Sequence, residues 1–597
     1  MDPKTKYISR LKSYKEHLKW LLKKQSQLSI LRLTAGFLLI GGLYFYWGSS
    51  IVLIIFLILL LVSIYGWLLI EDSDNKTKIN HQEFLIKIVD NELASLSGNH
   101  EQFESGSRFI QKDHSYTSDL DIFGHASVFQ MLNRTSSVHG SEMLANWLSA
   151  PAEVQDILLR QSAIKELMDR PEWMEEIRAT GMENPLDQSG RIKLREWLAE
   201  KKSPITNRQV LFLKFIYPSI MFLITLFFIA GLLSWKVLAI ALILFGFISE
   251  NTRKKLNPVF DLLDGLSPLM QALAKVLQKT ESEIFRSPLL LSITESCRSY
   301  GQSGSKEIKK FSFILERHDL RRNKMLAPIL EIYFSWSVRQ FIQLERWKSL
   351  NKEKVEVWFD SLAQLETLIS FATVAQNHPD WSFPTFTQDS LIIQGVELGH
   401  PLIENVKSVP NDVEALEKGN IMLVTGSNMA GKSTYLRTIG VNVVMSMAGS
   451  PICGRSLKIS PSNLITSMRV TDNLEESTST FYAELKKLKK IIEKVNNNEP
   501  VFILLDEILR GTNSKDRHTG SVGLLNQFIR KNATGIIATH DLELADLKQT
   551  YPKNIFNYHF DVTVSNSELS FDYKLKPGIC TSMNASILMQ KIGIELP

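Results

Sequence analysis

The segment Thr425–Thr434 has the residue types and spacing that bind a polyphosphate. It reads Thr-Gly-Ser-Asn-Met-Ala-Gly-Lys-Ser-Thr and fits the pattern G-x-x-x-x-G-K-[ST] directly after the apolar run 421–424. The run 435–447 that follows contains no proline and one glycine, so it can continue as a helix whose N-terminus faces the phosphates. The segment therefore predicts a nucleotide-binding loop at a strand-to-helix turn.

Each defining residue of this loop has a physical role. Gly426 and Gly431 let the backbone curl so that successive N–H groups point at the phosphates, and Lys432 supplies a cation for the β- and γ-phosphates. Ser433 would offer its hydroxyl to Mg²⁺. The predicted nucleotide contacts are Gly426, Asn428, Gly431, Lys432, Ser433, Thr434 and Asp506.

Two further apolar runs end in polar residues that could complete the site. The run 501–505 ends in Asp506 and Glu507, as a buried parallel strand does when it delivers acids to its carboxyl edge. Asp506 suits Mg²⁺, directly or through water, and Glu507 is then placed to polarise an attacking water. The run 535–539 ends in His540, which could sense the γ-phosphate. On its own such a histidine is more often structural, but its place after a third matched strand favours a role in the site.

These segments together resemble the ATPase domain of the MutS family, the mismatch-repair and recombination-linked branch of ABC-type ATPases. The resemblance rests on the segments 425–434, 506–512 and 538–540, with smaller matches at 399–403, 409–412, 479–481 and 573–578. The segments 132–135 and 144–148, with Gly140, resemble the start of the family's helical core. The resemblance covers roughly residues 115–200 and 250–597.

The resemblance implies an ATP hydrolase whose active site is shared between two copies of the chain. In such ATPases a serine from the signature segment of one subunit reaches the γ-phosphate held by the other, and Ser479 is the candidate here. The same stretch could equally cap a helix, because Ser and Thr before Glu484 fit that use. The implied cofactors and partners are ATP, Mg²⁺, DNA and a second copy of the chain. The implied catalytic residues are Glu507, His540 and Ser479.

The chain departs from the family pattern at three places. Ala430 stands where the family usually has glycine, and Ser408 stands where many relatives carry an aromatic thought to stack on adenine. At the N-terminus we expect no globular mismatch-reading domain, because the sequence offers no room for one there. The sequence instead begins with a basic segment that contains Lys4, Lys6, Arg10, Lys12, Lys15, Lys19, Lys23 and Lys24.

Two pairs of apolar runs predict membrane hairpins. The first pair is 33–47 and 51–70, and the second is 215–233 and 237–248. The longer runs suffice to cross a bilayer, and 215–233 lacks the polar face of a soluble helix. A buried hairpin in a large soluble core is the alternative for the second pair. A cleavable signal peptide fits the first pair poorly, because its apolar stretch is too long and a second one follows at once.

Charge predicts the orientation of these spans. Basic flanks before 33 and after 248 favour the cytoplasmic side, and four spans keep every soluble part and both termini there. The expected location is a bacterial-type cytoplasmic (inner) membrane, with the lipid bilayer as a partner. Net charge of +5 permits DNA binding without arguing for it, and three scattered cysteines fit a reducing compartment.

The predicted fold class is an α/β ABC-type P-loop ATPase domain joined to an all-α core and lever domain, with four transmembrane helices in two hairpins. The expected organisation is a basic segment 1–30, a hairpin 31–70, a linker helix and first core part 71–209, a second hairpin 210–250, a helical lever 251–398 and the ATPase domain 399–597. In this arrangement the second hairpin takes the place where the family has the tip of its DNA clamp.

The favoured function is a membrane-anchored, MutS-like ATPase that acts on DNA, in mismatch repair or recombination by resemblance. One alternative is an ATPase that moves or remodels a bilayer component without DNA. A second alternative is a nucleotide-gated scaffold with little turnover, and the presence of Glu507 argues against it.

Overall fold

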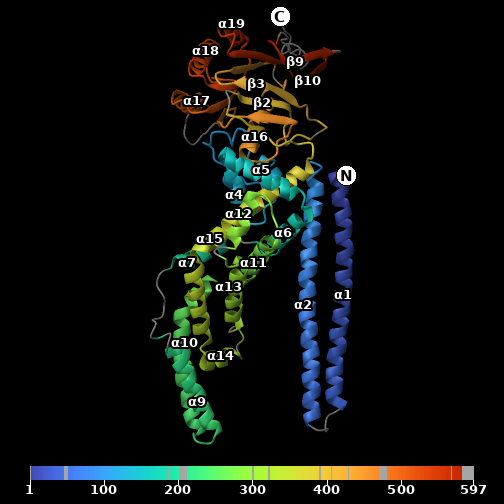
Figure 1. Cartoon of the computed structure of the whole chain (residues 1–597), viewed down its shortest axis with the longest axis vertical. Helices are drawn as coiled ribbons and strands as arrows, with labels where there is room; N and C mark the ends of the chain where they lie inside the picture. Colours follow the sequence, from blue (N-terminus) through green and yellow to red (C-terminus); the bar gives the residue numbers. More distant parts are fainter. Residues whose placement is uncertain are drawn as a thin grey trace.

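The molecule is elongated, with a mixed sheet-and-helix unit at one end and two helical hairpins reaching toward the other (Figure 1). The computed structural model describes residues 2–45, 51–185, 188–200, 209, 212–298, 301–320, 323, 325–388, 391–404, 406–427, 429–468, 480–565 and 568–580. Between the sheet unit and the hairpins lies a bundle of helices around an apolar core that continues into the sheet unit.

A six-stranded sheet forms the centre of the C-terminal unit. Its strand order is β10-β9-β4-β8-β7-β6, with parallel pairing throughout except between β9 and β10. The strands are β4 (Ile421–Thr425), β6 (Asn463–Ser467), β7 (Val501–Asp506), β8 (Thr534–Thr539), β9 (Ile555–Ser565) and β10 (Glu568–Pro577). Strands β4, β7 and β8 are buried along their whole length, which explains their continuous apolar sequence.

Helices and a smaller sheet complete this unit. The helices are α16 (Lys432–Ala448), α17 (Thr480–Asn496), α18 (Ser514–Arg530), a 3₁₀ turn η4 (Leu542–Asp546) and α19 (Leu547–Thr550). The smaller sheet has the order β1-β5-β2-β3, from Thr385–Phe386, Ser456–Ile459, Leu391–Leu398 and Asn411–Glu417 respectively. Helix α16 lies almost wholly buried between the main sheet and the helical bundle.

Whereas β1 and β2, within residues 385–398 of the predicted lever 251–398, are strands of the smaller sheet, the bundle is helical up to Asn377. It contains η1 (Ser107–Phe109), α3 (Val128–Leu132), α4 (Val138–Ser149), α5 (Val154–Met168), α6 (Pro171–Glu183), α7 (Gln188–Ala199), α11 (Leu266–Ser282), α12 (Pro288–Cys297), α13 (Gly304–Asp319), α14 (Ala327–Phe334) and α15 (Trp336–Asn377). Helix α15 has 42 residues and is therefore about 63 Å long. It runs from the neighbourhood of the second hairpin to the edge of the sheet unit.

Two helical hairpins extend from the bundle in the same direction (Figure 1). The first consists of α1 (Pro3–Phe45) and α2 (Ile51–Ser95), which pack along each other. The second consists of a π-helical turn η2 (Phe212–Ile216), α9 (Tyr217–Ile229) and α10 (Trp235–Leu262). Helix α10 continues past residue 250 into the bundle, and the second hairpin packs on α14 through Phe222 and Tyr333.

Two helical stretches in the described part of the chain are long and apolar enough to cross a membrane, Phe212–Ile229 and Trp235–Leu262. The sequence predicted four spans, and the described part of the chain has two such helices. Both stretches are largely exposed: 22% of the first window and 6% of the second are buried. A buried hairpin in a soluble core, the alternative for the second pair, does not fit that exposure.

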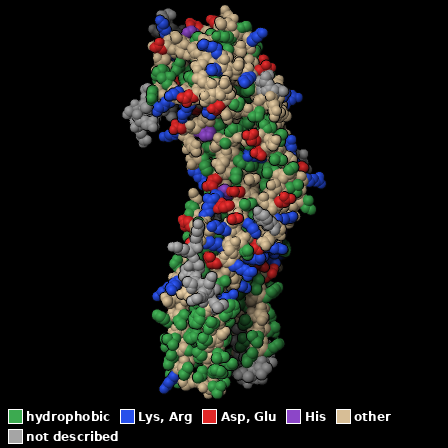
Figure 2. All heavy atoms as spheres, turned by 60° about the vertical axis from the view of Figure 1, so that its left-hand side comes forward, with side chains coloured by type: hydrophobic (Ala, Val, Ile, Leu, Met, Phe, Trp, Pro, Cys, Tyr) green, Lys and Arg blue, Asp and Glu red, His purple; other side chains and the backbone are tan. Residues whose placement is uncertain are grey.

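The distal ends of both hairpins are apolar and exposed. Figure 2 shows hydrophobic side chains covering the end of the molecule that holds the second hairpin. Exposed residues of α9, α10 and the turn between them include Leu226, Ile229, Leu232, Trp235, Ile243 and Phe247, and those of α1 and α2 include Leu33, Phe37, Ile40, Phe56 and Leu59. An exposed apolar surface of this extent is typical of a surface that contacts a membrane or another protein.

A buried ion-pair network fastens the first hairpin to the bundle. Glu92 of α2 is fully buried and accepts hydrogen bonds from Arg134 Nε at 2.8 Å and Asn377 Nδ2 at 2.9 Å. Arg178 Nη2 lies 2.8 Å from the same carboxylate. Burial alone would raise the pKa of Glu92, but the two arginines outweigh it and lower that pKa to about 2. Tyr7 of α1 donates to Asn377 Oδ1 at 2.8 Å, so both helices of the hairpin meet at the end of α15.

Removing Arg134 should loosen this attachment strongly. In Arg134→Met the buried Glu92 carboxylate keeps Arg178 and loses its other cation, so we expect a loss of about 3 to 5 kcal/mol in the free energy of unfolding. The matched control is Arg195→Met, which breaks a solvent-exposed pair with Glu356 and should cost about 1 kcal/mol or less. Denaturant unfolding in detergent measures both. Equal effects of the two substitutions would contradict the anchoring role.

Candidate nucleotide site

The predicted strand-to-helix turn is present at residues 425–432. Strand β4 ends at Thr425 and α16 begins at Lys432. Gly426 has a φ of 151°, and a Cβ there would lie 3.0 Å from the carbonyl oxygen of Phe560. Gly431 has a φ of 108°, which side chains rarely adopt. The two glycines are thus required by the backbone path of the loop itself.

Lys432 is the centre of the site. Its side chain is buried, and Nζ donates to the carbonyl oxygens of Gly426 at 2.8 Å and Ser427 at 3.0 Å. Nζ also lies 3.2 Å from Nε2 of His540. Burial lowers the pKa of Lys432, and the carboxylates of Glu507 and Asp506 oppose that shift. A desolvated ammonium held by neutral carbonyl groups is a strong attractor for an anion.

The acids and the histidine meet at the carboxyl edge of the sheet. The parallel register pairs Asp506 of β7 with Ala538 of β8, so Glu507 and His540 follow on adjacent strands. His540 Nε2 lies 2.9 Å from Glu507 Oε1. The hydrogen bond from His540 is the main cause that lowers the pKa of Glu507, and the nearby cation of Arg510 lowers it further. The carboxylate is therefore kept ionised. Glu507 has a φ of 53°, a sparsely populated backbone region that is often found at functional sites.

Two residues without a role in the sequence prediction hold this edge in place. Arg510 pairs with Glu507 Oε2 at 3.1 Å and donates to the backbone oxygen of Asp506 at 3.2 Å. Glu484 of α17 is buried and accepts backbone N–H groups of Leu509 and Arg510. Burial raises the pKa of Glu484. Arg510 belongs to the matched segment 506–512, whereas Glu484 carries no local signal, because its target is the backbone of a distant turn.

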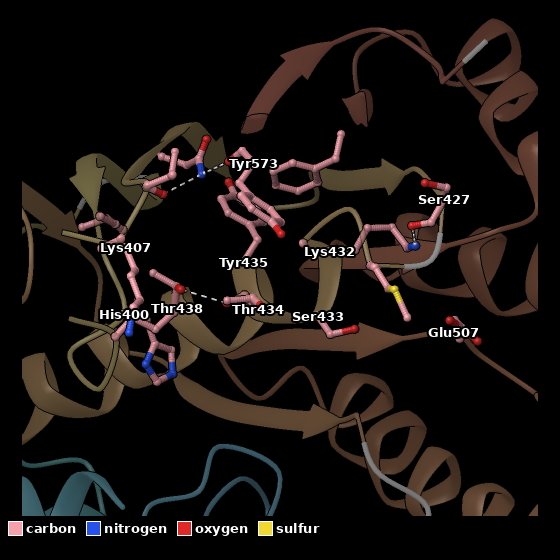
Figure 3. Close-up of a pocket in the computed structure, with 18 residues that line it drawn as sticks. His400, Lys407, Ser427, Lys432, Ser433, Thr434, Tyr435, Thr438, Glu507 and Tyr573 are labelled. Atoms are coloured by element: carbon pink, nitrogen blue, oxygen red, sulfur yellow. Dashed lines mark hydrogen bonds between the residues drawn. The ribbon is translucent and has the colours of Figure 1, made fainter. Parts of the chain in front are cut away.

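A cavity of about 510 Å³ adjoins the loop and has two chemically distinct ends. Figure 3 shows Ser427, Lys432, Ser433 and Glu507 at one end, with Tyr573, His400 and Lys407 toward the other. The first end is polar and suits phosphates. At the second end burial lowers the pKa of His400 to about 4, so its imidazole is neutral, and Tyr573 lines the same cavity.

The second end of the cavity contains a ring, although Ser408 replaces the aromatic that was expected to stack on adenine. Ser408 does line the cavity, where it supplies no ring. Tyr573 lines the same cavity from β10, and its ring lies so close to the loop that a Cβ on Gly431 would be 3.2 Å from it. Both rings lie in segments that carried the family resemblance, 399–403 and 573–578. The tertiary structure brings these two segments, which are far apart in sequence, to one cavity.

The residues present fit Mg²⁺. Asp506 is buried, and its Oδ1 has no hydrogen-bond partner among the described residues. Ser433 lines the cavity with its hydroxyl on the side of Glu507 (Figure 3). A carboxylate and a hydroxyl are hard oxygen ligands, which Mg²⁺ prefers together with water and phosphate oxygens. Oδ1 of Asp506, without a partner among the described residues, is available to a cation or its water.

The predicted site residues are placed as follows. Gly426, Gly431, Lys432, Asp506, Glu507 and His540 come together at one sheet edge, and Ser433 and Thr434 line the adjoining cavity. Ala430 is fully buried under the loop. Asn428 and Ser479 lie outside the described residues, and α17 begins at Thr480.

A parallel sheet with a glycine loop, a buried lysine and acids at its carboxyl edge defines a nucleotide-binding α/β unit. Comparisons with known proteins agree with that class: residues 422–592 match the model of MutS domain V. Over 245 residues the chain is 34% identical to MutS protein homolog 4 of Homo sapiens, covering 39% of this chain and 25% of that protein. This C-terminal unit is therefore similar to the ATPase domain of the MutS family.

Two further relatives give the same picture. The chain is 34% identical over 224 residues to the DNA mismatch repair protein MutS of Lactobacillus johnsonii, covering 36% of this chain and 26% of the relative. It is 30% identical over 293 residues to the DNA mismatch repair protein MSH3 of Candida glabrata, covering 46% and 28%. The chain thus spans only about a quarter of the length of the curated relatives it matches.

Replacing Lys432 should abolish nucleotide binding. In Lys432→Ala the phosphates lose a charge-assisted hydrogen bond, so we expect an affinity for ATP at least about 100-fold weaker. Lys418→Ala, an exposed lysine before β4, is the matched control and should bind as the wild type does. Titration with a fluorescent ATP analogue measures both. Tight binding by Lys432→Ala would overturn the assignment of the loop.

Proposed function

We propose that this chain is a membrane-anchored, MutS-like ATPase that hydrolyses ATP with Mg²⁺ and binds DNA. The observation that carries the proposal is the Lys432, Glu507 and His540 constellation at the sheet edge, within the segment that matches MutS domain V. The DNA part is supported by the relatives, two of which are named as DNA mismatch repair proteins. Mismatch repair or recombination is the process that this similarity favours.

The geometry assigns a separate task to each side chain. Lys432 would exchange its contacts with the carbonyl oxygens of Gly426 and Ser427 for phosphate oxygens. Glu507, kept ionised by His540 and Arg510, would orient and polarise the attacking water. His540 lies between Lys432 and Glu507 and can register whether a γ-phosphate separates them. Ser433 and Asp506 would hold Mg²⁺, which neutralises charge on the phosphates.

We propose further that two copies of the chain complete the site. By resemblance, Ser479 of one copy would reach the γ-phosphate bound by the other. The hydrolytic edge at Glu507 and Lys432 lines an open cavity, so a partner surface has access to it. A homodimer that forms with ATP and dissociates after hydrolysis would convert turnover into movement of α15.

The hairpins are proposed to anchor the protein in a cytoplasmic membrane of bacterial type. Their exposed apolar ends extend in one direction, away from the sheet unit, and the N-terminal end of α1 lies back toward the bundle (Figure 1). All soluble parts, including both termini, would then share the cytoplasmic side with ATP. Since Glu92 and Asn377 tie the first hairpin to α15, the membrane part is not a loose tether.

A second candidate is an ATPase that moves or remodels a bilayer component without DNA. The observation that favours it is the mechanical connection between α15 and both hairpins, which would deliver ATP-driven motion to the membrane. A nucleotide-gated scaffold is less consistent with the site, because Glu507 and His540 are held in hydrogen-bond contact as hydrolysis requires.

ATPase measurements in detergent separate these functions. We expect wild-type turnover to be stimulated by duplex, mismatched or branched DNA, with stimulation fading as salt rises. Glu507→Gln should bind ATP yet lower turnover by at least about 100-fold, because a water-polarising group is lost while Lys432 and the Mg²⁺ ligands remain. Robust turnover without any response to DNA would favour the bilayer-coupled function. Binding without turnover would favour the scaffold.

Cysteine labelling tests the membrane anchor. In a chain whose native cysteines are replaced by alanine, Ser234→Cys lies between α9 and α10 and Lys112→Cys lies in the bundle. An impermeant maleimide added to intact cells should label Ser234→Cys alone, and lysis should be needed to label Lys112→Cys. Protein released from membranes by alkaline carbonate, or labelling of Lys112→Cys in intact cells, would contradict the proposed topology.

A further inference from the structure

The outer face of α1 carries a stripe of five lysines, Lys4, Lys12, Lys15, Lys19 and Lys23. All five are exposed. At 3.6 residues per turn they fall within an arc of roughly 100°. Tyr7, Tyr14 and Leu21 pack toward the rest of the molecule from a different face of the helix. Helix α1 lies at the edge of the molecule in Figure 1, in agreement with the exposure of the five lysines.

The stripe keeps a net positive charge, although Glu16 lies at its edge, four residues after Lys12 and three before Lys19. Within the described residues, the α1 cations that form ion pairs are Arg10, Lys24 and Arg32, which lie outside the stripe. Glu16 is the one acid between residues 3 and 32. Residues 1–32 hold nine basic and two acidic residues, whereas the whole chain has a net charge of +5, so the rest of the chain is net acidic. The positive charge of the protein is concentrated on this helix.

The geometry decides between two anionic partners, lipid and nucleic acid. Helix α1 is continuous from Pro3 to Phe45, so its basic part and its apolar part share one axis. Lys23 and Lys4, the two ends of the stripe, lie 10 and 29 residues before Leu33, where the apolar part begins. At 1.5 Å per residue these distances are about 15 and about 43 Å. Attraction to lipid headgroups fades within a Debye length of about 8 to 10 Å.

A helix that enters the bilayer along this axis therefore cannot lay its stripe on the membrane surface. Most of the stripe stands in water, as a straight row of cations about 28 Å long. Duplex DNA presents one negative charge per about 1.7 Å of its axis, so such a row meets many phosphates at once. The exposed lysines are also long and form no ion pair with a described residue, which suits sequence-independent phosphate contact.

We propose that the lysine stripe of α1 is a docking surface for the phosphate backbone of duplex DNA, held clear of the bilayer by the first hairpin. This inference rests on the proposed function, because it takes the hairpin as membrane-embedded and DNA as the partner. It adds where the DNA is held: on the N-terminal helix beside the bundle. Since the contact is to phosphates, it would carry no sequence preference.

The test compares two triple charge reversals in the full chain in lipid nanodiscs. One carries Lys12→Glu, Lys15→Glu and Lys19→Glu within the stripe. The control carries Lys112→Glu, Lys352→Glu and Lys490→Glu, three exposed lysines elsewhere, and changes net charge equally. Fluorescence anisotropy of a labelled duplex is measured across a salt series. The stripe variant should bind at least about 10-fold more weakly at low salt, with a salt slope smaller by about 3, and the control should match the wild type.

Each outcome decides something. If wild type binds DNA and the stripe variant has an unchanged slope, the stripe assignment is wrong while the proposed function stands. If wild type binds no duplex in nanodiscs that support ATP turnover, DNA fails as the partner and the stripe proposal fails with it. If the reversal instead reduces the anionic lipid retained by the purified protein and leaves the DNA slope unchanged, the stripe binds lipid and the nucleic-acid assignment is overturned.

Discussion

The buried ammonium of Lys432 imposes the constraint on which the rest of the site depends. A cation in a desolvated position needs oxygen ligands and nearby negative charge, and the loop supplies the carbonyl groups of Gly426 and Ser427 while β7 supplies the acids. These groups converge because the central strands are parallel and in register, so that their carboxyl ends meet at one edge. The nearly complete burial of α16 fixes the other wall of the loop.

The long helix α15 relates this site to the two hairpins. At one end, Arg339 of α15 donates to the backbone oxygen of Lys214, at the start of the second hairpin. At the other end, Asn377 bonds to Glu92 and Tyr7 of the first hairpin, next to the sheet unit. The bundle also touches the sheet unit directly, where Asp119 accepts from Thr466 at 2.8 Å. A shift of the sheet unit on the bundle would therefore reach both hairpins through packed helices.

Local signals predicted the loop well and the supporting residues poorly. Short segments were enough to predict the strand before Gly426, the helix after it and the acids at 506 and 507, because each feature depends on the residue pattern within its own segment. Glu484 and the cavity that His400 and Tyr573 both line had no such signal, because each depends on chain segments that are far apart in sequence. Four membrane spans were predicted, and two helices in the described part of the chain are long and apolar enough to cross a membrane. The prediction for the first hairpin still rests on composition and exposed apolar side chains.

The sequence by itself determined the class of site, because glycine, lysine and carboxylate at fixed spacing have one common use, and it determined where the apolar and basic stretches begin. The tertiary structure alone decided how these parts relate in space. It placed His540 between Lys432 and Glu507, joined both hairpins to one helix, and aligned the lysines of α1 with the axis of its apolar half. The physical reason is range: backbone conformation and hydrophobic pattern are local properties, whereas burial, ion pairing and the direction of a helix depend on contacts between distant segments.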